Sequence, residues 1–254
     1  MLRRLVSLCL LGLATVLPSH SESAADLVRA GLAAEANREV RRALDLFLAA
    51  EKAAPPDGFL LQKIAQQYSD LTPELPTKEE KRTSAERALA YSQRAVAADP
   101  KNAVNVLSVA VSYGKLAVYS DTRDKVRYSR FVLENAERAL ALDPAYAWAH
   151  HVAGRWNYEV ATLGATARFF VRLFYGGLPE ASVATAVRHL RRALELEPGE
   201  LQHHLELGFA LLAAGDPAAA RAAWQHGLGL PSKGIHDEPA KARARAALAD
   251  LGPA

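Results

Sequence analysis

The chain has 254 residues, of which half are apolar, and a formal net charge of +3. A chain of this length can bury a substantial core without disulfide bonds, and it contains a single cysteine, Cys9. The small net charge gives no support to nucleic-acid binding, which depends on many lysine and arginine contacts with phosphate. Abundant alanine and leucine favour helices throughout the chain.

The N-terminal segment has the pattern of a secretory signal peptide. Arg3 and Arg4 precede a largely apolar stretch at residues 5–17, and small polar residues follow. The apolar stretch is too short to span a bilayer as a helix. The sequence therefore predicts a signal peptide at residues 1–24, one helical-repeat domain at residues 25–254, and export to a bacterial periplasm. A targeting segment for mitochondria or another organelle of a eukaryotic host is the alternative.

Five segments of the chain end a helix in the same way, with an Ala or Gly four or five residues before a Pro. This pattern is typical of tetratricopeptide repeats, whose unit of about 34 residues has small residues at positions 8, 20 and 27, a large residue at 24 and Pro near 32. In the first repeat these residues are Gly31, Ala43, Ala50, Phe47 and Pro55. In the last repeat they are Gly208, Ala220, Gly227, Trp224 and Pro231.

The central repeats are longer than this unit. The successive prolines at 55, 100, 144, 198 and 231 are 45, 44, 54 and 33 residues apart. Three central repeats therefore contain insertions of roughly 11, 10 and 20 residues. The final segment, residues 237–251, is Ala-rich and charged, as expected of a helix that caps a solenoid. The predicted fold class is all-α: a tetratricopeptide-like helical-hairpin solenoid of about five repeats, with insertions in the central three and a C-terminal capping helix.

One central motif, Gly-Arg-Trp-Asn-Tyr-Glu-Val-Ala at residues 154–161, together with the insertion pattern, resembles the regulator of microtubule dynamics family and its bacterial relatives. Further segments in the family style are residues 64–70, 113–115, 173–182 and 194–198. The similarity runs over about residues 26–251. It implies a tetratricopeptide-like helical protein and a partner-binding mode. Animal members of the family are intracellular and associated with microtubules or with mitochondrial and endoplasmic reticulum membranes.

The first helix of the fourth repeat presents the richest set of candidate binding residues. Positions 2, 5, 9, 12 and 13 of such a helix normally line the concave face, and here they are Trp148, His151, Arg155, Tyr158 and Glu159. These side chains are suited to gripping a peptide by stacking and bidentate hydrogen bonds. In the alternative interpretation Trp156 and Tyr158 pack against the inserted segment and Arg155 pairs with Glu159 one turn away. The sequence predicts a non-catalytic scaffold for a protein or peptide partner of unknown identity.

The longest insertion contains an apolar segment at residues 167–175, with two arginines. Phe169, Phe170 and Phe174 are candidates for contact with a membrane surface or a partner. The favoured interpretation is an inserted helix that folds onto the solenoid and is capped by Gly176 and Gly177. The membrane interpretation would make the protein a membrane-associated tether, and in a eukaryotic host the chain would be a microtubule- or organelle-associated regulator.

Motifs for other chemistry are absent from the sequence. It contains no phosphate-binding glycine loop, zinc-protease motif or nucleophile elbow, so no catalytic residues and no cofactor are predicted. The pairs His150-His151 and His203-His204 are expected to be solvated and not metal ligands, because neighbouring residues lie about 100° apart on a helix. The charged runs at residues 188–192 and 241–245 are expected to be solvated helix faces.

Overall fold

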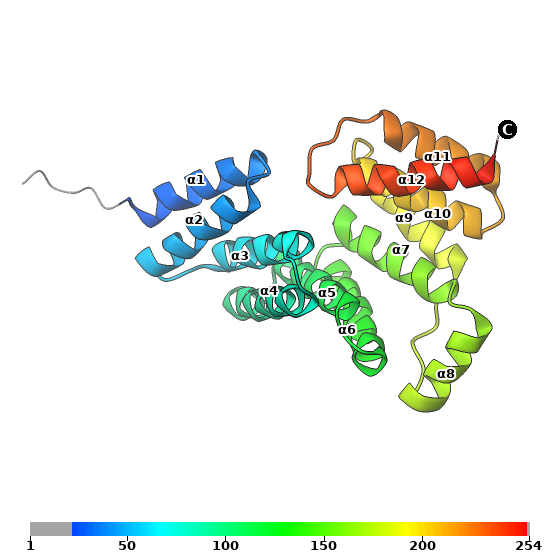
Figure 1. The fold of residues 1–254 in the computed structure, drawn as a ribbon, viewed down its shortest axis with the longest axis horizontal. Coiled ribbons are helices and arrows are strands. Elements are labelled where there is room, and N and C mark those ends of the chain that lie inside the picture. The colour runs from blue at the N-terminus through cyan, green and yellow to red at the C-terminus, as the bar shows by residue number, and fades with distance from the viewer. Residues whose placement is uncertain (1–21, 253–254) are drawn as a thin grey trace, which may run out of the picture.

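The computed structural model describes residues 22–252, and this part of the chain consists of helices joined by loops (Figure 1). The predicted signal peptide lies outside the described residues except for its last three positions. The elements are α1 (Ala24–Ala36), α2 (Val40–Ala53), α3 (Gly58–Leu71), the 3-10 helix η1 (Thr72–Glu74), α4 (Lys78–Ala98), α5 (Ala103–Val118), α6 (Thr122–Leu142), α7 (Ala147–Ala161), α8 (Ala165–Tyr175), α9 (Val183–Leu196), α10 (Leu201–Ala213), α11 (Pro217–Gly229) and α12 (Asp237–Leu251).

Five helix hairpins follow one another along the chain and form an arc (Figure 1). They are α1 with α2, α3 with α4, α5 with α6, α7 with α9, and α10 with α11. Helix α8 is inserted within the fourth hairpin, and α12 packs against α10 and α11. The first two insertions lengthen the second helices of their hairpins, since α4 and α6 have 21 residues each. The predicted all-α solenoid of five repeats with a C-terminal capping helix is confirmed.

The small residues of the repeat pattern allow the two helices of a hairpin to come into contact. A Cβ atom at Gly31 would lie 2.5 Å from the ring of Phe47, and one at Gly208 would lie 2.3 Å from the indole of Trp224. Both aromatic side chains are fully buried. Positions 8 and 24 of the repeat therefore touch, and glycine at position 8 leaves the space that a large aromatic at position 24 occupies.

Replacing Gly208 with Ala is expected to lower the free energy of unfolding by about 1–2 kcal/mol. The close approach of the new Cβ to the Trp224 indole puts the cost of overpacking in the upper part of its usual range, about 2–3 kcal/mol, which outweighs the gain in helix propensity of about 1 kcal/mol. Trp224 cannot move aside freely, because its Nε1 donates a 2.9 Å hydrogen bond to the carbonyl of Leu205. Urea unfolding measures the change. Gly199→Ala is the control, since no atom lies within 4 Å of its new Cβ; equal stability of the two variants would contradict the prediction.

The loop between α11 and α12 joins the last repeat to the first. Arg38, in the turn between α1 and α2, donates a 2.6 Å hydrogen bond to the carbonyl of Ser232 in this loop. Ile235 packs against the core formed by α1, α2 and α3, and His236 Nε2 lies 2.8 Å from Asp70 Oδ1. We call this segment the closing loop, and it lies opposite the α1–α2 turn in Figure 1. Its contacts turn the arc into a closed ring.

Helix α8 does not fold onto the solenoid, so the favoured interpretation of the longest insertion is wrong. None of its residues is buried. Phe169, Phe170 and Phe174 are 60%, 50% and 65% exposed. The predicted cap is present, because Gly176 ends the helix in the left-handed conformation at a φ of 73°. The helix stands away from the arc in Figure 1, in agreement with the exposure of its phenylalanines.

Candidate functional site

The first helices of the hairpins carry a continuous series of polar side chains, which we call the inner polar surface. Its members come from α1, α3, α5, α7 and α10, with one residue from α12. They are Glu35, Lys63, Gln66, Gln67, Asp70, Lys115, Arg155, Glu159, Glu206 and Arg243. The series connects successive repeats, because several members contact residues of a neighbouring first helix or of α12.

The N-terminal part of this surface satisfies its own polar groups. The carboxylate of Glu35 accepts hydrogen bonds from Lys63 Nζ at 2.7 Å, Gln66 Nε2 at 3.3 Å and Gln67 Nε2 at 3.2 Å. Asp70 is occupied by its contact with His236 of the closing loop. This part therefore offers little unsatisfied charge to a ligand.

The central part is different, because it holds a lysine without a partner. Lys115 is half-buried, and among the described residues its ammonium makes no hydrogen bond or ion pair. Burial lowers the pKa of Lys115, while the nearby Asp70 carboxylate opposes this shift and the Arg155 guanidinium adds to it. A half-buried cation without a counter-ion is a favourable position for an anionic group from outside the chain.

Arg155 lies beside Lys115, and the carboxylates of Glu206 and Glu159 both attract its guanidinium. Its Nε donates a 2.8 Å hydrogen bond to Glu159 one turn along α7, and the two side chains are 49% and 55% exposed. Exposed ion pairs of this kind contribute about 0.3–0.5 kcal/mol. A carboxylate that approaches Arg155 can therefore replace Glu159 at little cost.

The C-terminal part contains a buried carboxylate. Glu206 on α10 is 6% exposed, and its Oε2 accepts a 2.6 Å hydrogen bond from Arg243 on α12. The Arg243 guanidinium also lies 3.9 Å from the ring centroid of Phe209. The prediction that residues 241–245 are only a solvated face is wrong at two positions: Arg243 pairs with Glu206, and Lys241 is 6% exposed. Charge runs in sequence do not reveal which members meet a buried partner.

The five predicted binding residues fall into two groups. Arg155 and Glu159 are exposed on the inner polar surface, and Tyr158 is half-buried with its ring 6.4 Å from that of Phe209. Trp148 is half-buried, and His151 is only 5% exposed, so His151 is not accessible to a partner. The predicted pairing of Arg155 with Glu159 is present. A role of these residues in binding stays a prediction.

The neighbouring Trp156 packs in a different place from the one that the sequence predicted. Its Nε1 donates to the carbonyl of Ser129 at 2.7 Å, so it packs against α6 and not against the inserted helix. The ring is 4% exposed. The family-like motif at residues 154–161 therefore contributes both to the hairpin core and, through Arg155 and Glu159, to the inner polar surface.

Two of the histidines predicted to be solvated are buried against each other. His151 Nδ1 lies 3.0 Å from His203 Nδ1, and both rings contact Trp148. Burial lowers the pKa of His151 and of His203 to about 3, so both are neutral near pH 7. Within residues 22–252, no group of three or more His, Cys, Asp or Glu residues is placed to hold a metal ion.

The stacked hairpins and the inner surface define a tetratricopeptide-type solenoid. A thermophilic tetratricopeptide protein from Thermus thermophilus matches it with a TM-score of 0.65 and 21% identity, over 89% of this chain and 100% of that one. MamA, residues 41 to the end, from Desulfovibrio magneticus RS-1 matches with a TM-score of 0.50 and 14% identity, over 82% of this chain and 94% of that one. These likenesses concern the fold.

The family follows from the sequence. The model of the family "Regulator of microtubule dynamics protein 1-3" matches residues 26–252, and the chain belongs to this family. Regulator of microtubule dynamics protein 3 of Xenopus laevis is 27% identical over 139 residues, which are 55% of this chain and 30% of the relative. Protein 1 of Mus musculus is 25% identical over 152 residues, 59% of this chain and 50% of the relative. The matches thus span half or less of these relatives' length.

Fold and family thus agree on a tetratricopeptide-like member of the regulator of microtubule dynamics family.

Proposed function

We propose that this protein is a scaffold that holds one segment of a protein partner on the inner polar surface, with Lys115 and Arg155 binding a carboxylate of that segment. The observation that carries the proposal is the half-buried Lys115, which has no partner within residues 22–252, beside Arg155, whose pair with Glu159 is exposed. Two cations at one place favour an anionic group, and the guanidinium fork of arginine suits a carboxylate in particular.

First helices of the hairpins also carry exposed apolar side chains, one of them close to Lys115 in the sequence. Val111 lies one turn before Lys115 on α5 and is 43% exposed. Phe59 on α3 and Val104 on α5 are 48% and 42% exposed. A partner segment with apolar side chains beside an acidic residue would complement this pattern.

Arg155→Gln and Lys115→Met are each expected to weaken binding of such a segment tenfold or more, about 1.4 kcal/mol. The ligand for the test is a peptide selected from a random display library on the wild-type protein, and fluorescence anisotropy measures its Kd. Thermal unfolding should be nearly unchanged for Arg155→Gln, because the Arg155–Glu159 pair is exposed.

The control is Arg192→Gln on α9. Arg192 pairs with Glu195 at 2.9 Å and is 47% exposed, so it matches Arg155 in geometry but lies on a second helix of its hairpin. Its substitution should leave Kd unchanged. Selected peptides without acidic residues, or equal Kd values for Arg155→Gln and wild type, would refute the proposal. A marked loss of thermal stability in Arg155→Gln would make the residue structural.

A further inference from the structure

The outward side of α8 is an apolar surface without a partner in the described chain. Phe169, Phe170, Leu173 and Phe174 are 60%, 50%, 60% and 65% exposed. Their spacing places them on one side of the helix. The rings of Phe170 and Phe174 are stacked, with centroids 5.9 Å apart. We call these four residues the α8 apolar face.

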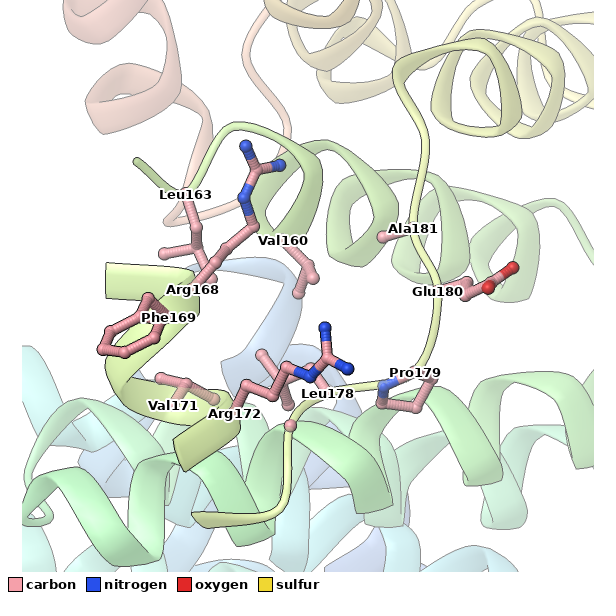
Figure 2. Close-up of a pocket in the computed structure, with 11 residues that line it drawn as sticks. Val160, Leu163, Arg168, Phe169, Val171, Arg172, Leu178, Pro179, Glu180 and Ala181 are labelled. Carbon is pink, nitrogen blue, oxygen red and sulfur yellow. The ribbon is translucent and has the colours of Figure 1, made fainter. Parts of the chain in front are cut away.

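The opposite side of α8 carries its positive charge. Arg168 and Arg172 line a hollow of about 480 Å³ between α8, the end of α7 and residues 177–181 (Figure 2). Apolar side chains line the rest of this hollow, among them Val160, Leu178 and Phe169 of the α8 apolar face. Phe170, Leu173 and Phe174 do not line it and are exposed.

Arginine side chains connect α8 to α6 and α7 by donating hydrogen bonds to backbone carbonyl oxygens. Arg130 of α6 donates hydrogen bonds to the carbonyl oxygens of Tyr175 and Gly177, at the C-terminal end of α8. Arg168 Nη1 donates a 3.3 Å hydrogen bond to the carbonyl of Ala161, at the end of α7. These contacts position the helix without covering the α8 apolar face.

Helix α8 itself carries only positive charge, because it contains Arg168 and Arg172 and no Asp or Glu. Glu180, beyond the helix, also lines the hollow. Apolar side chains with arginines on the same helix are complementary to a surface that has an apolar interior covered by a layer of anionic groups. The interfacial region of an anionic bilayer has this arrangement.

A second copy of the chain is a poorer occupant. Four half-to-two-thirds exposed large side chains offer roughly 400 Å² per copy, or about 800 Å² for two copies, while stable interfaces bury about 1,200–2,000 Å². A bilayer needs no matching protein surface, and an outward helix can lie flat on it. The area therefore favours lipid over self-association.

We propose that the α8 apolar face docks the protein on the surface of an anionic lipid bilayer. Within the described residues, no helix is long and apolar enough to cross a membrane. With 11 residues, α8 is about 16 Å long, against a hydrocarbon core of about 30 Å. It would lie in the interface, with the four apolar side chains at the acyl boundary and the guanidinium groups at the level of the phosphates. This surface is separate from the inner polar surface.

Vesicle flotation of the full chain tests the proposal. One set of vesicles contains phosphatidylcholine alone, and the other contains equal parts of phosphatidylcholine and phosphatidylglycerol. The wild type is expected to float with the anionic vesicles at least tenfold more than with the neutral ones. Phe169→Ser combined with Phe174→Ser should lower the floated fraction tenfold or more, and Arg172→Gln should lower it severalfold.

Phe170→Ser and Phe59→Ser form a matched pair, since these phenylalanines are 50% and 48% exposed on different helices. Only Phe170→Ser should reduce flotation. Equal flotation of the wild type and the double Phe variant, or no flotation of the wild type with either vesicle, would overturn the proposal. Self-association of the wild type without vesicles, lost in the double Phe variant, would overturn it in favour of a second copy.

Discussion

Lowering the pH from about 7 to about 5 is expected to remove roughly 2–4 kcal/mol of the free energy of unfolding through His151 and His203. The rings are 5% and 0% exposed, and their Nδ1 atoms lie 3.0 Å apart. A proton on either ring places a charge in a buried site, and a second proton places two like charges side by side. Glu197 Oε2, 3.7 Å from His203 Nε2, is the nearest carboxylate and is 45% exposed.

The sign of this effect follows from the two states of the chain. In the unfolded chain each histidine binds a proton near pH 6.5, while in the fold burial lowers the pKa of His151 and His203 to about 3. Between these values the unfolded state binds more protons. The stabilisation is therefore complete above about pH 6.5 and is lost as the pH falls toward 3.

Urea unfolding at several pH values measures this loss. A double variant, His151→Gln with His203→Gln, should show a flatter pH dependence than the wild type, because amides do not titrate in this range. His226→Gln replaces an exposed histidine and should keep the wild-type slope. Equal slopes for the double variant and the wild type would assign acid sensitivity to other groups.

Replacing Arg243 with Ala is expected to lower the free energy of unfolding by about 2–3 kcal/mol. Glu206 is 6% exposed, and Arg243 is its hydrogen-bond partner among the described residues, with Oε1 left without one. The variant therefore leaves a carboxylate buried and unpaired. The cost is below that of a fully buried pair, because the Arg243 side chain is 43% exposed and water can enter.

Arg245→Ala on the same helix is the control. Arg245 is 57% exposed and 3.9 Å from the exposed Glu238, so its loss should change stability by at most about 0.5 kcal/mol. Adding Glu206→Gln to Arg243→Ala should recover part of the loss, since the neutral amide costs less to bury. If Arg243→Ala is as stable as Arg245→Ala, the buried pair does not hold α12 against α10.

The repeat pattern was predictable because it is local. Gly31 and Phe47, or Gly208 and Trp224, lie 16 residues apart within one hairpin, and their sizes are complementary. The positions facing the ring interior were predictable in the same way, which is how Arg155 and Glu159 were found. Lys115 was not singled out in this way, and only its lack of a hydrogen-bond partner among the described residues distinguishes it.

Contacts between distant repeats were not predictable. Arg38 meets the closing loop 194 residues away, and His236 meets Asp70 166 residues away. Their geometry depends on the accumulated curvature of all five hairpins, including the three insertions. The burial of His151 has the same origin, since it requires His203 from the next hairpin, 52 residues on.

The helices, their pairing into five hairpins and the family could be predicted from the sequence, because each rests on spacing within about 34 residues or on direct similarity. Which charged and aromatic groups have partners depends on the three-dimensional arrangement of the hairpins. This arrangement closes the ring through the loop before α12, leaves Lys115 unpaired among the described residues, buries His151 and turns the aromatic residues of α8 outward. The reason is physical: helix spacing follows from local sterics, whereas burial depends on how the hairpins stack.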